Sequence, residues 1–121
     1  LYASVMGDKF SIAFPKIHGR QFTGTGDLFA SLVLARWDGK TRDSLREACE
    51  LGLAGMNGVL RRTNEKAERA GGEKSRDCEL CIIESRESIE RPEALFKAVM
   101  LEIKFINIIY TCIWHFLHII S

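Results

Sequence analysis

Residues 22–32 read Phe-Thr-Gly-Thr-Gly-Asp-Leu-Phe-Ala-Ser-Leu, and this stretch is the strongest indication of the fold in the chain. Two glycines and an aspartate stand directly before an apolar run that continues to position 35. Glycine permits the sharp turn that leads an extended segment into a helix. The pattern therefore predicts a helix that starts at this turn. Because the run is apolar on nearly every side, we expect the helix to be buried and to be stopped at Gly39.

The start of such a helix can bind an anion. Its first N–H groups have no partner within the helix, and the helix dipole favours negative charge there. Asp27 stands at the mouth of this site, where a carboxylate can accept the proton of an attacking hydroxyl, and Thr25 can add a hydroxyl donor. An alternative is that Asp27 only caps the helix by bonding to the backbone. The Gly-Lys-Ser/Thr ending of a Walker loop is absent.

The residues before the glycine turn read as a strand. Residues 9–14 alternate, which puts Phe10, Ile12 and Phe14 on one face. Pro15 then interrupts the pattern, because proline cannot donate to a sheet ladder.

A second helix is predicted to start near Ser44, with Ser44 and Glu47 forming a capping box. Gly52, Gly55 and Gly58 weaken this helix, so we expect a neighbouring backbone to approach them closely. Charged residues dominate 61–69, and the glycine pair at 71–72 ends the helix. Beyond it we expect a short strand over 79–84 with its apolar residues at 80–83, a helical turn over 85–90, and a strand or short helix over 95–101.

Composition places the chain among small globular domains. It has 121 residues, 46% of them hydrophobic and 27% charged, with a net charge of +1 that implies no pull toward nucleic acid. Cys78 and Cys81 form a CxxC pair, but no second pair stands at zinc-site spacing. We therefore expect free thiols in a reducing compartment, which favours the cytoplasm.

Residues 102–121 differ in character from the rest. They are rich in isoleucine and aromatic residues and lack a clear polar face. The apolar run is shorter than the roughly 20 residues that a membrane-spanning helix needs. We interpret it as an appended tail of unknown role, with a membrane anchor as the less favoured alternative.

The glycine-aspartate stretch resembles the signature of the ribokinase-like kinases, and its tight form is similar to that of the pyridoxal kinases. Further landmarks of that family's last third are Ala-Cys-Glu at 48–50, Val-Leu-Arg-Arg-Thr at 59–63, Glu-Leu at 79–80 and Ser-Ile-Glu-Arg-Pro-Glu at 88–93. The resemblance covers roughly residues 4–101. It implies that residues 1–101 are the C-terminal part of a three-layer α/β/α domain with a mainly parallel central sheet.

The resemblance also implies a function and a set of site residues. The family phosphorylates the 5′-hydroxyl of pyridoxal, pyridoxine or pyridoxamine with ATP and a divalent cation, usually Mg²⁺, as cytoplasmic homodimers. By motif, Asp27 is the proton acceptor. Gly24, Thr25 and Gly26 form the anion hole around the transferring phosphate. Less securely, Pro15, Lys16, Ile17 and His18 align with the loop that flanks the ATP base, although an ordinary strand-to-loop turn explains them equally well.

One departure limits the implied function. The family's front two-thirds holds the substrate pocket, the lid and the residues that serve metal and phosphates, and none of it is present in these 121 residues. We therefore expect the fragment to be poorly active alone. Two alternatives stay open: another ribokinase-like kinase acting on a different small hydroxyl compound, or a truncated product without catalytic function.

Overall fold

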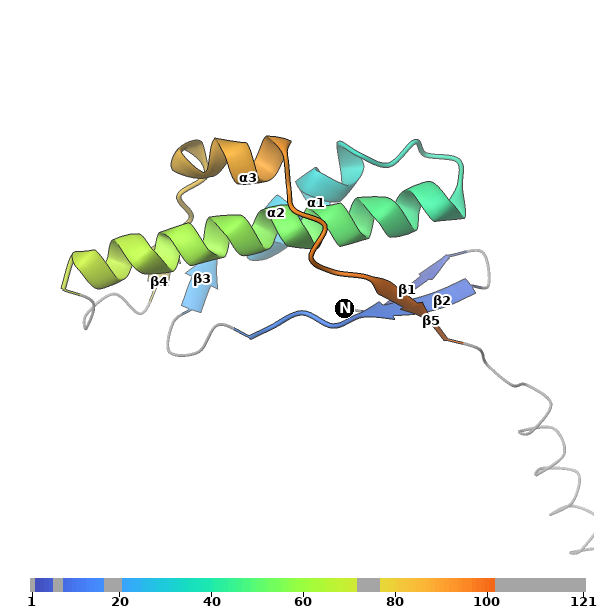
Figure 1. Ribbon diagram of the computed structural model, residues 1–121, viewed down its shortest axis with the longest axis horizontal. Coiled ribbons are helices and arrows are strands. Elements are labelled where there is room, and N and C mark those ends of the chain that lie inside the picture. Colours follow the sequence, from blue (N-terminus) through green and yellow to red (C-terminus); the bar gives the residue numbers. More distant parts are fainter. Residues whose placement is uncertain (1, 6–7, 17–20, 72–76, 102–121) are drawn as a thin grey trace, which may run out of the picture.

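One long helix organises the structure, a computed structural model that describes residues 2–5, 8–16, 21–71 and 77–101. In Figure 1 this helix, α2 (Arg42–Arg69), runs across the molecule with α3 (Arg86–Glu90) above it and α1 (Thr25–Leu34) crossing behind it. The strands lie on the side of α2 opposite to α3 (Figure 1). They are β1 (Tyr2–Val5), β2 (Asp8–Ile12), β3 (Gln21–Thr23), β4 (Asp77–Glu79) and β5 (Ala98–Met100).

The strands form two small sheets. The first has the order β1-β2-β5 with both pairs antiparallel, and Phe10 lies opposite Met100. In the second, β3 and β4 pair in parallel, with Thr23 opposite Glu79. The described residues thus form a mixed helix and strand structure in which β3 and β4 are the parallel pair.

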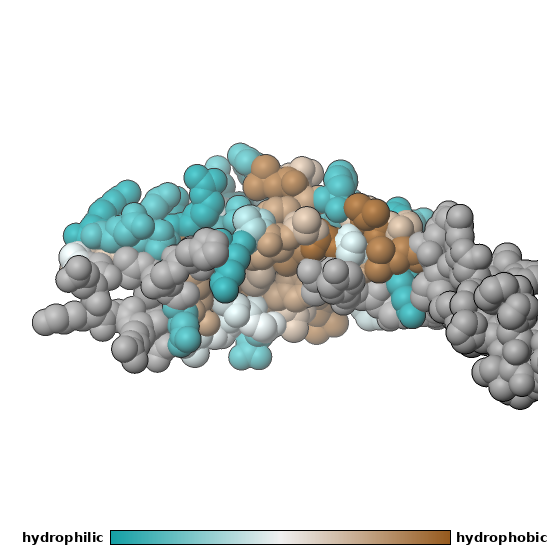
Figure 2. All heavy atoms as spheres, turned by 90° about the horizontal axis from the view of Figure 1, so that it is seen from below, coloured by the Kyte–Doolittle hydropathy of each residue, from teal (hydrophilic) through white to brown (hydrophobic). Residues whose placement is uncertain are grey.

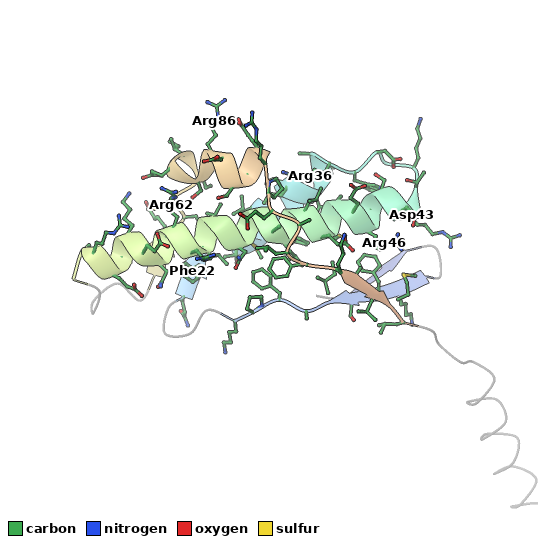
Figure 3. All side chains as sticks on the ribbon, in the orientation of Figure 1. Phe22, Arg36, Asp43, Arg46, Arg62 and Arg86 are labelled. Atoms are coloured by element: carbon green, nitrogen blue, oxygen red, sulfur yellow. The ribbon has the colours of Figure 1, made fainter. Side chains whose placement is uncertain are left out.

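The core lies between the strands and α2. The strand predicted over 9–14 is confirmed for its first part, because Phe10 and Ile12 are buried while Phe14 follows the end of β2 and packs on Phe96 with ring centroids 5.4 Å apart. Val59 of α2 is fully enclosed. Figure 3 shows Phe22 of β3 beneath α2, and this ring packs against the same core.

The three glycines of α2 are contact points for the other helices; the predicted approach of a neighbouring backbone is found at Gly55 and Gly58, whereas Gly52 meets side chains. A side chain at Gly52 would meet Val33 of α1 at 3.2 Å, and one at Gly55 would meet the Ser88 carbonyl oxygen at 3.4 Å. At Gly58 an added Cβ would lie 2.4 Å from the Ser88 Cβ. The missing side chains therefore let α1 and α3 lie close to α2.

The start of α2 differs from the predicted capping box. Thr41 is the N-cap, and its side chain accepts a hydrogen bond from the Ser44 backbone N–H at 3.2 Å. Asp38 in turn accepts hydrogen bonds from the Lys40 and Thr41 N–H groups and from the Thr41 hydroxyl, at 2.8–2.9 Å. The cap lies earlier than predicted because this Asp38 turn already orders the residues before Ser44. At the other end, the helix stops before Gly71, which has φ 87°.

Three further expectations need correction. The first helix is not buried on every side, because Leu28 and Leu32 are buried whereas Leu34 is 73% exposed. It also ends at Leu34, so Gly39, at φ 73°, lies in the connection to α2 and is not the stop signal. The strand expected over 79–84 is wrong beyond its first residue: β4 ends at Glu79, and a 3₁₀ turn (Ile83–Ser85) leads into α3.

The C-terminal part of the described chain follows the predictions more closely. The helical turn expected over 85–90 is α3, and of the two alternatives for 95–101 the strand is confirmed for residues 98–100, which form β5. Glu50 of α2 holds this strand, because it accepts the Ala98 N–H at 2.7 Å and pairs with Lys97 at 3.2 Å. Residues 102–121, which carry the expected tail, lie outside the described residues.

Hydrophobic residues form part of the surface on the strand side (Figure 2). Figure 2, which looks at that side, shows them over the middle of the molecule, with hydrophilic residues at the end where α2 finishes. Large apolar residues that are exposed include Ile83 at 88% and Val99 of β5 at 62%. Within the described ranges, no helix is both long enough and apolar enough to cross a membrane.

Candidate active site

The glycine-aspartate stretch lies where two parallel strands end together. Thr23, the last residue of β3, is paired with Glu79, the last residue of β4. Ligands of open α/β sheets bind at the carboxyl ends of parallel strands. A cavity of about 520 Å³ opens at this edge, and we call it the strand-end cavity. Its walls include Gly24, Asp27 and Ser31 from the β3–α1 side and Glu79 and Leu80 from the β4 side.

Gly24 makes the turn from β3 into α1. It is the N-cap residue and adopts the left-handed conformation, with φ 85°. A residue with a Cβ is strained in this conformation, whereas glycine is not. The Gly24 carbonyl then accepts the first helical hydrogen bond, from the Leu28 N–H at 3.0 Å. The Gly24 backbone therefore fixes where the helix begins relative to the cavity.

The helix start offers free hydrogen-bond donors. The first helical bond is made by Leu28, so the N–H groups of Thr25, Gly26 and Asp27 have no acceptor among the described residues. Gly26 has open space around it, since nothing lies within 4 Å of a Cβ added there. It does not take a left-handed conformation, so its contribution is room for a ligand, and only Gly24 supplies the turn. Thr25 is half-buried, and neither Thr25 nor Gly26 lines the strand-end cavity.

Asp27 faces the cavity and not the interior. Its residue is exposed, and it is not the helix cap, because the N-cap residue of α1 is Gly24 and the Asp27 carboxylate accepts no hydrogen bond within the described residues. The alternative in which Asp27 is only a capping residue is therefore wrong. Ser31, one helical turn later, donates its hydroxyl to the Asp27 carbonyl at 2.8 Å. The Asp27 carboxylate is thus free to meet a ligand beside three unpaired N–H groups.

A buried network fixes the opposite wall. The Cys81 N–H donates to the Thr63 hydroxyl of α2 at 3.0 Å, and that hydroxyl donates to the Val59 carbonyl at 2.8 Å. The Ser85 hydroxyl donates to the Cys81 carbonyl at 2.5 Å. These bonds hold both backbone groups of Cys81, so the position of Leu80 in the cavity wall depends on α2. The Leu80 methyl group would lie 4.0 Å from a Cβ at Gly24.

The described charged side chains that line the strand-end cavity are all negative. Asp27 and Glu79 bring two carboxylates to its lining, and no described lining residue is cationic. Its remaining walls are mainly apolar, with Leu28, Leu80 and Ile82 among them. An anionic ligand at this edge would therefore depend on the helix N–H groups and on cations that the described residues do not supply.

The second group of predicted site residues is only partly described. Pro15 and Lys16 are exposed residues after β2, and neither lines the strand-end cavity. Ile17 and His18 lie outside the described residues. In the described ranges, no three His, Cys, Asp or Glu side chains are grouped closely enough to hold a metal ion.

The structure describes the side chains of two of the cysteines that were predicted to be free thiols. Cys49 and Cys81 are both free and buried. Burial raises the pKa of the Cys49 thiol above its usual value, with the neighbouring Glu50 carboxylate as a second cause. The side chain of Cys78 and all of Cys112 lie outside the described part.

Ser31, Glu79 and Thr63 were missed as site residues in the sequence. Ser31 stands four residues after Asp27, a spacing that places both on one helix face and could have been noticed. Glu79 could not have been noticed in this way, because its position depends on the pairing of two strands that are more than 50 residues apart in the sequence. Thr63 interrupts the apolar face of α2, and a polar residue there signals a buried hydrogen bond.

Comparison with known proteins gives a consistent family. The chain is 40% identical to the pyridoxal kinase of Sus scrofa over 84 residues, which are 66% of this chain and 26% of that protein. It is 39% identical to the pyridoxal kinase of Arabidopsis thaliana over 92 residues, or 75% of this chain and 29% of the relative. A putative pyridoxal kinase of Caenorhabditis elegans is 38% identical over 93 residues. No family model matches the chain.

The predicted resemblance to pyridoxal kinases is confirmed over most of the chain. The chain spans between a quarter and a third of the length of these relatives.

Proposed function

We propose that this chain, a relative of the pyridoxal kinases, supplies the phosphate-binding and proton-accepting part of such an enzyme. The reaction is transfer of the terminal phosphoryl group of ATP to the 5′-hydroxyl of pyridoxal, pyridoxine or pyridoxamine. The observation that carries the proposal is the free Asp27 carboxylate beside three unpaired helix N–H groups at the carboxyl edge of β3 and β4.

In the proposed reaction, the substrate hydroxyl lies against Asp27 and the terminal phosphate lies over the start of α1. The hydroxyl oxygen forms a bond to phosphorus while the bond from phosphorus to the ADP oxygen breaks. The hydroxyl proton passes to Asp27, and a positioned base of this kind contributes about 10²–10⁴-fold in rate. The unpaired N–H groups of Thr25, Gly26 and Asp27, at the anion hole proposed for Gly24, Thr25 and Gly26, stabilise the charge on the phosphoryl oxygens.

A divalent cation such as Mg²⁺ would neutralise charge on the phosphates. The described residues do not offer a ligand set for this ion, so we assign its ligands to no residue of this chain. Pro15 to His18 stay proposed as the segment beside the ATP base.

The proposed fold is the ribokinase-like three-layer domain, with residues 1–101 as its C-terminal part and 102–121 as an appended tail. Exposed apolar side chains such as Leu34 and Val99 agree with this proposal, since a larger domain would cover them. The β3–β4 pair would be part of the mainly parallel central sheet. A homodimer in the cytoplasm, without a nucleic-acid or membrane partner, remains part of the same proposal.

A chimera tests the proposal. The part of the Sus scrofa enzyme that matches this chain is replaced by the corresponding residues of this chain, and phosphorylation of pyridoxal is measured with ATP and Mg²⁺. We expect activity, and we expect Asp27→Asn to lower kcat by about 10²–10⁴-fold. Asp43→Asn, an exposed acidic residue in the first turn of α2, is the matched control and should change kcat less than twofold.

Two results would count against the proposal. A folded chimera that keeps full kcat after Asp27→Asn would remove Asp27 from the reaction. A chimera that is folded yet inactive toward every vitamer would support the alternative of a product without catalytic function. Preference for a sugar, a nucleoside or a hydroxymethylpyrimidine would instead favour the other ribokinase-like kinases.

A further inference from the structure

A second cavity lies between α2 and the segment that contains α3, away from the strand-end cavity. We call it the helix cavity. It has a volume of about 340 Å³ and is lined by both helices and by the chain that follows α3. Gly58 and Ser88, which lie against each other, are both part of its lining. The cavity is within the size range of small-ligand sites, at its lower end.

Asn57 is the unusual residue of this cavity. It is only 8% exposed, yet it lines the cavity, and its side-chain amide has no hydrogen-bond partner in the described structure. In the described part, every fully buried side-chain nitrogen or oxygen has a hydrogen-bond partner. Because the Asn57 amide has none, its nitrogen and oxygen must be partly accessible. The cavity that the residue lines provides this access. A buried amide without a protein partner costs free energy unless a ligand or water pairs with it.

The charged side chains around Asn57 are also unpaired. Arg61, one helical turn after Asn57, and Arg91, after α3, both line the cavity and form no ion pair within the described residues. Glu87 and Glu93 line the same cavity, and their carboxylates have no partner there either. Two guanidinium groups and two carboxylates thus line one small cavity without forming an ion pair with each other.

We propose that the helix cavity binds a small zwitterion that carries an oxyanion and an ammonium group. Asn57, Arg61 and Arg91 donate to the oxyanion, because guanidinium groups and amides match the oxygens of phosphate or carboxylate. Glu87 and Glu93 accept from the ammonium group. A simple anion would meet the two carboxylates without compensation, and a simple cation would meet the two arginines.

Binding can be followed on Asn57 itself. The full 121-residue chain, labelled with ¹⁵N, is titrated with O-phosphoethanolamine, and the side-chain NH₂ signals of Asn57 are monitored by NMR. A carboxylate zwitterion, β-alanine, is titrated in parallel to distinguish the two oxyanions. Inorganic phosphate and ethanolamine test the anion and the cation alone. We expect a saturable shift of the Asn57 signals with at least one zwitterion and at least about tenfold weaker binding of either single ion.

Variants separate the cavity from the general surface. Arg61→Ala and Arg91→Ala should each weaken binding by at least about tenfold, as should Glu87→Gln with Glu93→Gln. Arg62→Ala is the matched control, because Arg62 is the next arginine along α2 and does not line the cavity; binding should change less than twofold. All five substituted side chains are exposed, so the variants are expected to fold, and amide dispersion in the same spectra verifies this.

Three results would overturn the proposal. The first is an Asn57 signal that does not move with either zwitterion. The second is inorganic phosphate binding as tightly as O-phosphoethanolamine with no effect of the glutamate substitutions. The third is an equal loss of binding in Arg61→Ala and Arg62→Ala, which would indicate attraction to the basic surface and not a site.

Discussion

Gly58 of α2 and Ser88 of α3 approach so closely that a Cβ on Gly58 would lie 2.4 Å from the Ser88 Cβ and 2.6 Å from its hydroxyl oxygen. The Ser88 Cβ is fixed to its backbone, so it cannot move away without a shift of α3. The distance to the Ser88 Cα would be 3.8 Å, an ordinary contact. The close approach of α2 and α3 thus depends on the absence of one side chain and the small size of another.

This contact predicts a coupled pair of substitutions. Gly58→Ala should gain about 1 kcal/mol of helix propensity but lose about 1–3 kcal/mol by overpacking against Ser88. The variant should therefore be less stable than propensity alone predicts. Adding Ser88→Gly removes the clashing atoms, so the double variant should recover the overpacking loss. Urea unfolding of the four proteins of the cycle measures the coupling free energy.

The control is Gly26→Ala, because nothing lies within 4 Å of a Cβ added at that position. It should show no coupling to Ser88→Gly. Additive effects of Gly58→Ala and Ser88→Gly would show that the two helices move apart freely.

The Thr63 hydroxyl should matter for the cavity wall. Thr63→Val keeps the shape but leaves the buried Cys81 N–H without its acceptor, which costs about 1–3 kcal/mol. Thr63→Ser keeps the hydroxyl and loses only a methyl group. Hydrogen exchange of the Cys81 amide reports the bond directly, and it should speed up in the valine variant only. Unchanged protection in Thr63→Val would mean that another group holds this amide.

Asp38 should make the start of α2 sensitive to acid. Hydrogen bonds from the backbone N–H groups of Thr41 and Lys40, in this order, hold the pKa of the Asp38 carboxyl below its usual value. A lowered folded-state pKa means that the folded protein binds fewer protons than the unfolded chain. The contribution is therefore present above the unfolded pKa of about 3.9 and is lost as the pH falls through the lower, folded-state pKa.

Asp38→Asn removes this dependence. The difference in unfolding free energy between the parent chain and the variant should be constant above about pH 5 and should shrink toward acid pH. Asp43→Asn provides the control for removing a charge near the same helix start. A difference that grows on acidification would contradict the assigned direction of the pKa shift.

The 121-residue chain alone should phosphorylate pyridoxal weakly or not at all. The strand-end cavity brings two carboxylates and no cationic side chain to the phosphate, and the groups that would orient the substrate are proposed to lie outside this chain. Misplaced reactants lose most of the advantage of a closed site, so we expect turnover below about one-thousandth of that of the Sus scrofa enzyme. Formation of pyridoxal phosphate, separated by chromatography, is the measurement. Robust turnover that Asp27→Asn abolishes would show that these residues suffice.

Local signals predicted local features well. Glycine and aspartate before an apolar run located the start of α1, and period-two alternation located β2. The resemblance to the pyridoxal kinases could be recognised from the sequence, because the family's motifs are spread along the chain. The start of α2 was misplaced because two different residues, Thr41 and Ser44, can each cap a helix, and the Asp38 turn decides between them.

Features that depend on distant contacts were not predictable in the same way. The apolar sequence of α1 indicated burial on every side. Which side is exposed depends on the elements that pack against the helix, and the sequence of the helix does not contain this information. Leu80 to Ile83 resemble a strand in composition, yet the Cys81 backbone bonds to Thr63 and Ser85 in place of a sheet partner. The pairing of Thr23 with Glu79, which creates the strand-end cavity, is likewise a long-range contact.

The shared end point of β3 and β4 restricts how this region of the gene can change. Only three residue pairs align the two strands, and the Cys81–Thr63 bond attaches the chain that follows β4 to α2. One extra residue between Glu79 and Cys81 would either break that bond or push Leu80 away from the glycine turn. Side chains in this segment can therefore be exchanged during evolution. Insertions or deletions would separate the ends of β3 and β4, where the proposed chemistry takes place.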